Sequence, residues 1–150
     1  MAEDLGFTIT RDFDAPARRL FRACSQPEFL RRWFGPVGWP LTLCEVDFRV
    51  GGRWRFAMTG PSGLQNTPFG GVYLEIVPDA RIVFDNTFEA PGAETMVMTF
   101  TFDEAAGRTR LTHHTLFASL GMKKLHLDGG FEVGTNSAFD QLAEVARGTG

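Results

Sequence analysis

The chain has 150 residues and a net charge of −3, and its composition is 43% hydrophobic and 22% charged. This length fits a single domain over residues 1–150, and the composition excludes a disordered chain. The acidic balance argues against nucleic-acid binding, and charges interrupt each apolar run, which argues against membrane insertion. The first residues lack the basic and apolar segments of a signal peptide, so we expect a cytoplasmic protein.

The N-terminal part predicts one strand followed by two short helices. Residues 7–13 alternate between apolar and polar side chains, which is typical of a strand. A first helix is expected to begin near Pro16 and to run to about Cys24. A second helix is expected from Pro27 to Trp33, because the Gly-Pro pair that follows ends a helix.

Six further segments alternate between apolar and polar residues and predict strands. They cover residues 41–50, 54–58, 72–77, 82–88, 96–102 and 111–117. In the third of them, Val72, Leu74 and Ile76 share one phase of the alternation. Alternation on one side only indicates an antiparallel sheet with one covered face and one face in water.

From Leu127 onward the apolar residues recur with a helical period. The stripe consists of Leu127, Phe131, Ala138, Leu142 and Val145. A long helix here would cover the sheet. The predicted fold class is therefore α+β, with a curved antiparallel sheet of about six to seven strands wrapped on a long C-terminal helix and two short helices after the first strand.

An ordered series of motifs runs along almost the whole chain. It consists of residues 13–16 (Phe-Asp-Ala-Pro), 27–36 (Pro-Glu-Phe-Leu-Arg-Arg-Trp-Phe-Gly-Pro), 44–56, 71–78, 81–84, 109–112 and 134–142 (Gly-x-Asn-x-x-x-Asp-x-Leu). Together these resemble the family named after the activator of heat-shock protein 90 ATPase, within the START-like (SRPBCC) superfamily. The resemblance implies a helix-grip fold with a cavity between the sheet and the long helix. It implies no particular chemistry, since this superfamily includes carriers, receptors and cyclases.

The chain departs from the pattern of the resembling family at two positions. That family commonly has Trp after the helix glycine, where this chain has Thr135, and an apolar residue where this chain has His113. A threonine fills less space than tryptophan, so we expect a cavity beside it. We also expect Thr135→Trp to raise the melting temperature and to block ligand uptake.

Two polar residues fall at apolar phases of their predicted strands, namely Asn86 and His113. A polar group on a covered face is either satisfied by hydrogen bonds or faces a cavity. We therefore predict that a small hydrophobic or amphipathic molecule binds between sheet and helix. The expected ligand-binding residues are Trp54, Phe56, Phe84, Asn86, Met98, Phe100, His113, Phe131, Thr135 and Ala138.

Other interpretations of the same residues stay open. Asn86 and His113 could simply bond to each other or to water. A cofactor-free cyclase or hydratase would use His113 as its acid/base. A co-chaperone-like interaction module is suggested by the family name, and a homodimer is a further alternative for the partner.

Several kinds of site lack support in the sequence. His113 and His114 are adjacent on a strand and point to opposite faces, so no metal site is expected, and no glycine-rich phosphate loop indicates a nucleotide cofactor. Cys24 and Cys44 are expected to be free thiols. A nucleophilic site made of Cys44 and His113 would need a third group to orient the histidine, and the sequence shows none. The arginines expected on solvated helix faces are Arg18, Arg19, Arg22, Arg31 and Arg32.

Overall fold

The computed structural model describes residues 4–148, which form one sheet and four helices. In chain order the elements are β1 (Gly6–Phe13), α1 (Ala17–Ser25), α2 (Pro27–Trp33), β2 (Leu41–Val46), β3 (Arg53–Met58), β4 (Phe69–Val77), β5 (Arg81–Phe88), β6 (Thr95–Ala105), β7 (Arg108–Leu116), α3 (Leu120–Asp128) and α4 (Phe131–Gly148). The predicted α+β class, with two short helices after the first strand and a long C-terminal helix, is confirmed.

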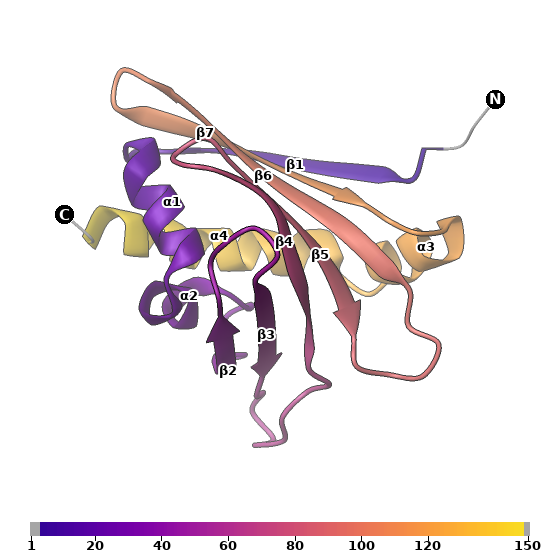
Figure 1. Cartoon of the computed structure of the whole chain (residues 1–150). Helices are drawn as coiled ribbons and strands as arrows, with labels where there is room; N and C mark the ends of the chain where they lie inside the picture. Colours follow the sequence, from indigo (N-terminus) through magenta and orange to yellow (C-terminus); the bar gives the residue numbers. More distant parts are fainter. Residues whose placement is uncertain (1–3, 149–150) are drawn as a thin grey trace.

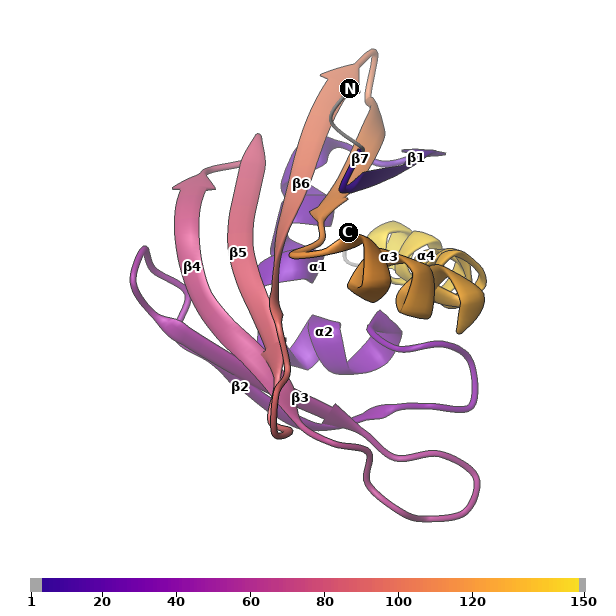
Figure 2. The same ribbon diagram turned by 90° about the vertical axis from the view of Figure 1, so that its right-hand side faces the viewer.

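The seven strands form a single antiparallel sheet in the order β1-β7-β6-β5-β4-β3-β2. Strands β2 to β7 follow one another as neighbours, and the pair α1–α2 carries the chain from β1 at one edge to β2 at the other (Figure 1). The sheet is strongly curved, and the helices lie on its concave side (Figure 2). This arrangement gives the sheet one covered face, as the alternation predicts.

The long helix does not begin at Leu127, as the helical stripe suggested. Leu127 belongs to α3, a separate helix that begins after Ser119, whose hydroxyl accepts a hydrogen bond from the Met122 amide at 3.1 Å. The chain then turns at Gly129-Gly130, and Gly130 adopts a φ of 91°, which glycine tolerates far better than other residues. This turn separates α3 from α4, so Leu127 and Phe131, which were expected on one helix, lie on two.

The alternation in β4 also differs from the prediction, because the strand carries an irregularity between Tyr73 and Glu75. As a result Tyr73 is buried and Leu74 is 45% exposed, so Val72, Leu74 and Ile76 do not share one inward face. The strand expected over residues 41–50 is shorter as well, since β2 ends at Val46. Both differences arise where turns and bulges interrupt the ladder.

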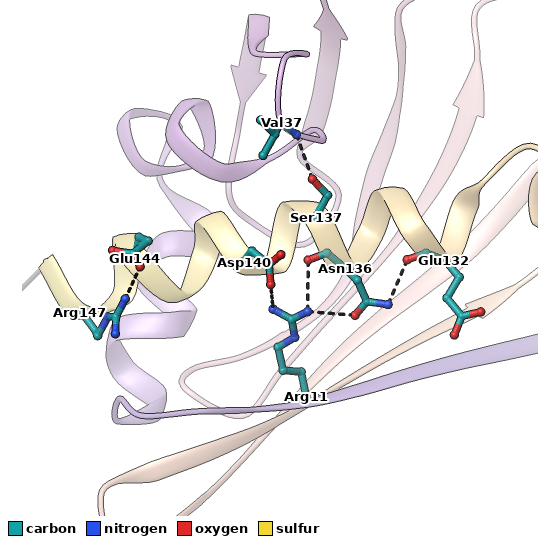
Figure 3. Close-up of polar contacts among 8 residues, drawn as sticks. All are labelled: Arg11, Val37, Glu132, Asn136, Ser137, Asp140, Glu144 and Arg147. Carbon is teal, nitrogen blue, oxygen red and sulfur yellow. Dashed lines mark hydrogen bonds and ion pairs between the residues drawn. The ribbon is translucent and has the colours of Figure 1, made fainter.

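Polar contacts hold α4 on both of its flanks (Figure 3). From β1, Arg11 forms an ion pair with Asp140 at 2.6 Å and donates to the backbone carbonyl and the side-chain oxygen of Asn136, each at 3.2 Å. On the opposite flank, the Ser137 hydroxyl accepts from the backbone N–H of Val37 at 3.0 Å. Together they fix the helix between β1 and the segment that follows α2.

The core is rich in aromatic rings that pack edge to face. The Phe13 and Phe139 rings lie 6.1 Å apart and join β1 to α4. Trp33 of α2 is almost fully buried, and its indole N–H donates to the Ala23 carbonyl of α1 at 2.8 Å. Cys24 is buried and unpaired in this core, as is Cys44 on β2, so both thiols are free as expected.

Gly71 on β4 makes room for two hydrogen bonds to Asp85 of β5. The Asp85 carboxylate accepts from the Val72 amide at 2.8 Å, and the Asp85 carbonyl accepts from the Trp54 indole at 3.1 Å. A Cβ atom at Gly71 would lie 2.1 Å from the Asp85 carboxylate and 2.3 Å from its carbonyl oxygen. No side chain other than hydrogen therefore fits here without moving the backbone.

We predict that Gly71→Ala lowers the free energy of unfolding by more than about 2 kcal/mol, because overpacking against backbone atoms is costly. Gly121→Ala is the matched control, since the nearest atom to a Cβ there is 3.9 Å away in the first turn of α3. That control should not destabilise the protein, because alanine favours helix. Urea unfolding of both variants measures the difference, and equal stability would contradict the steric argument.

Candidate functional site

A cavity of about 560 Å³ lies between the concave face of the sheet and α4. Strands β3 to β7 contribute one wall, α3 and α4 another, and the segment after α2 a third. Its lining residues are Trp33, Phe34, Gly35, Pro36, Met58, Phe69, Phe84, Asn86, Phe88, Met96, Met98, Phe100, His113, Leu125, His126, Gly129, Gly130, Phe131, Gly134, Thr135, Ala138 and Phe139. This size is in the range of small-molecule pockets.

The structure brings eight of the ten predicted site residues together around this cavity. They are Phe84, Asn86, Met98, Phe100, His113, Phe131, Thr135 and Ala138. Trp54 and Phe56 are buried but are not among the lining residues. The centroid of the Phe34 ring lies 5.0 Å from that of Phe56, and Phe34 lines the cavity. The Trp54 indole donates to the Asp85 carbonyl.

His113 stands on β7 among aromatic rings. Its ring centroid lies 4.8 Å from that of Phe100, 5.9 Å from Phe139 and 6.2 Å from Phe131. The side chain is 3% exposed, and neither ring nitrogen has a hydrogen-bond partner among the described residues. Burial lowers the pKa of His113 to about 3, with a smaller contribution from the neighbouring His114, so the imidazole is neutral at physiological pH.

Asn86 is the second buried polar residue of the lining. Its amide nitrogen lies 3.8 Å from the sulfur of Met98, which is a weak acceptor, and its side-chain oxygen has no partner among the described residues. Asn86 and His113 therefore do not bond to each other. Thr115 of β7 also has a buried hydroxyl without a described partner, although it is not among the lining residues.

Sequence reasoning missed the part of the lining that comes from outside the central strands. Trp33, Phe34 and Pro36 belong to a motif that indicated only the fold. His126 lies on α3, a helix that the sequence analysis did not predict, and its ring packs 6.1 Å from Phe131. The aromatic-rich segment before the Gly-Pro pair was a signal for these residues, but its position against Phe56 of β3 and Phe69 of β4 depends on the tertiary fold.

None of the described residues around the cavity is Asp, Glu, Lys or Arg. His113 and His114 face opposite sides of β7, since His114 bonds to the Thr8 hydroxyl at 3.0 Å on the outer face. Cys44 lies on β2, five strands away from β7, so the sheet does not bring it to His113. Within residues 4–148, no three potential metal ligands come together, and no helix has the length and hydrophobicity to cross a membrane.

The buried neutral imidazole predicts an acid-dependent loss of stability. Because the pKa of His113 is lower in the folded protein than its ordinary value of 6.5, the unfolded chain binds the proton first as the pH falls. The stability that the neutral His113 contributes to the folded protein is therefore fully present above about pH 6.5 and is lost as the pH falls toward 3. Between pH 7 and pH 5 this residue alone should remove about 2 kcal/mol of unfolding free energy.

Urea unfolding at these two pH values tests that prediction. Between pH 7 and pH 5, the unfolding free energy of His113→Leu should fall by about 2 kcal/mol less than that of the wild-type protein. The control is His114→Gln on the outer face, which should keep the wild-type difference. An unchanged pH dependence in His113→Leu would show that His113 is not held neutral by its surroundings.

Comparisons with protein-family models and with solved structures identify the family and the fold of this chain. The family model described as "Activator of Hsp90 ATPase homolog 1-like protein" matches residues 14–147. No curated protein is significantly similar to the chain. A solved protein from Nitrosomonas europaea is 26% identical with a TM-score of 0.87, and the match covers 98% of this chain and 97% of that one. One from Arthrobacter aurescens is 29% identical with a TM-score of 0.86, and the match covers 95% of this chain and 86% of that one. One from Mycobacterium smegmatis is 28% identical with a TM-score of 0.82, and the match covers 94% of this chain and 90% of that one. The chain therefore belongs to the activator of Hsp90 ATPase homolog 1-like family, with the SRPBCC fold that the sequence predicts.

Proposed function

We propose that this protein binds a small, mainly apolar molecule in the cavity between its sheet and α4. The observation that supports this most directly is the cavity itself, whose volume of about 560 Å³ is bordered mostly by aromatic and aliphatic side chains. A protein core is normally packed to crystal-like density, so a space of this size beside buried side chains supports a binding role. Modules with this fold typically bind ligands.

The apolar walls determine what such a site can bind well. Removing apolar surface from water contributes about 25 cal/mol per Å² for ligand and protein alike. The rings of Phe84, Phe100 and Phe131 also offer edges and faces to an aromatic ligand. Flat or extended apolar molecules therefore suit this cavity better than sugars or phosphates, which would lose their hydration without compensation.

An acid/base enzyme that uses His113 is less well supported by the same geometry. A general acid must carry a proton at the working pH, and burial lowers the pKa of His113 to about 3. A catalytic histidine is also usually oriented by a partner on its second nitrogen, and neither His113 nitrogen has one among the described residues. The interaction-module interpretation rests on the description of the family alone, so a binding role is the proposal we adopt.

Thr135→Trp tests the proposal from the helix side. Thr135 lines the cavity on α4, and an indole there would occupy part of the space between helix and sheet. We expect the melting temperature to rise, because filling a cavity stabilises proteins by about 0.5–2 kcal/mol. The variant should also bind the neutral dye N-phenyl-1-naphthylamine at least tenfold more weakly than the wild-type protein, as measured by calorimetric titration.

Val133→Trp is the matched control, because Val133 is on the same helix, is 76% exposed and does not line the cavity. It should leave both dye affinity and melting temperature close to the wild-type values. Equal dye binding by Thr135→Trp and Val133→Trp would contradict binding in this cavity. Unfolding of Thr135→Trp would mean that the site is already filled by side chains.

A further inference from the structure

The two buried polar side chains of the lining stand beside opposite ends of the Met96–Phe100 stretch of β6. Asn86 on β5 pairs with Met96 of β6, whereas His113 on β7 pairs with Phe100 of β6. Met96 and Phe100 are four residues apart on β6, which corresponds to about 13 Å along the strand. β6 also separates β5 from β7. Asn86 and His113 are therefore two separate hydrogen-bonding positions along the sheet.

Each end offers hydrogen bonds that no described residue satisfies. At one end Asn86 is 6% exposed, and its side-chain oxygen, an acceptor, has no partner. At the other end His113 is 3% exposed, and its neutral ring offers one donor and one acceptor. A buried polar group without a partner costs about 1–3 kcal/mol, so a hydroxyl or carbonyl placed beside either residue would recover free energy.

Apart from Asn86 and His113, the lining is mostly apolar, with His126 and Thr135 as its other polar side chains. Its phenylalanine and methionine side chains carry no strong hydrogen-bonding group. No Lys or Arg is among the described lining residues, so a carboxylate or a phosphate would lose its hydration without a counter-ion. A cationic ligand would meet no carboxylate there either.

From this arrangement we infer that the ligand is an uncharged, elongated and mainly apolar molecule with one hydrogen-bonding group, a hydroxyl or a carbonyl, at each end, one for Asn86 and one for His113. This inference rests on the proposed function, because it assigns the chemical class of the molecule that the cavity takes. In this inference Asn86 and His113 determine ligand specificity, and they take no part in a reaction.

A series of rod-shaped probes tests the inference in the wild-type protein. The probes are biphenyl, 4-phenylphenol, 4,4′-biphenol and biphenyl-4-carboxylate, titrated at pH 7 by calorimetry. Each added hydroxyl should tighten binding about fivefold, because each pairs one buried group. The carboxylate should bind at least tenfold more weakly than 4-phenylphenol, which has nearly the same shape.

Variants then assign each hydroxyl to its residue. Asn86→Leu and His113→Leu should each abolish one of the two gains, and the double variant should bind biphenyl at least as tightly as 4,4′-biphenol. Thr87→Val, on the outer face of β5 where Thr87 bonds to Thr95 at 2.6 Å, should keep the wild-type order of affinities. Biphenyl affinity and circular dichroism report whether each variant has folded, and if one has not, the wild-type order of affinities decides alone.

The outcomes separate the two proposals. Equal affinity for all three neutral probes, or tighter binding of the carboxylate, would overturn the inference about ligand class while leaving the binding function intact. An unchanged preference for hydroxyls in both folded leucine variants would also overturn it. If neither biphenyl nor N-phenyl-1-naphthylamine binds to the wild-type protein, the proposed function itself fails.

Discussion

The cavity depends on how α4 is attached, because the helix is held at its flanks rather than pressed onto the middle of the sheet. On one flank the Arg11 guanidinium donates hydrogen bonds to Asp140 and Asn136 (Figure 3). On the other flank Gln141 donates to the Gly35 carbonyl at 2.7 Å, close to the contact between Ser137 and Val37. Hydrogen bonds are directional, so contacts of this kind fix the height of the helix above the strands as well as its position.

With the helix fixed in this way, the inward side chains of the central strands decide what fills the space. Most of them are phenylalanine and methionine, which supply shape without polarity. Asn86, His113 and Thr115 are exceptions, and each leaves at least one buried polar atom without a described partner. Such groups lower stability when they replace apolar ones, so their presence in the core is expected mainly where function requires it.

The sequence predicts the parts of this structure that depend on local pattern. Strict alternation located the strands and placed Asn86 and His113 on the covered face, because a strand has only two faces. It failed where distant contacts override the pattern. The irregularity in β4 lies between Tyr73 and Glu75, next to a contact in which the Val72 amide donates to the side chain of Asp85, thirteen residues away. Trp54 and Phe56 were expected at the cavity, but Phe34, from the segment after α2, lines it and packs against Phe56. Neither contact can be read from spacing.

The middle of the wall that α4 presents to the cavity is built from small residues, between Phe131 and Phe139, and this sets the shape of the site. Gly134, Thr135 and Ala138 all line the cavity, so this part of the space lies over a single stretch of helix. A larger residue at any of these positions would shorten the cavity without touching the strands. The residues that determine ligand size are therefore separate from those that provide hydrogen bonds, which are on β5 and β7. A fold divided in this way can change its ligand through the helix alone while keeping the same sheet.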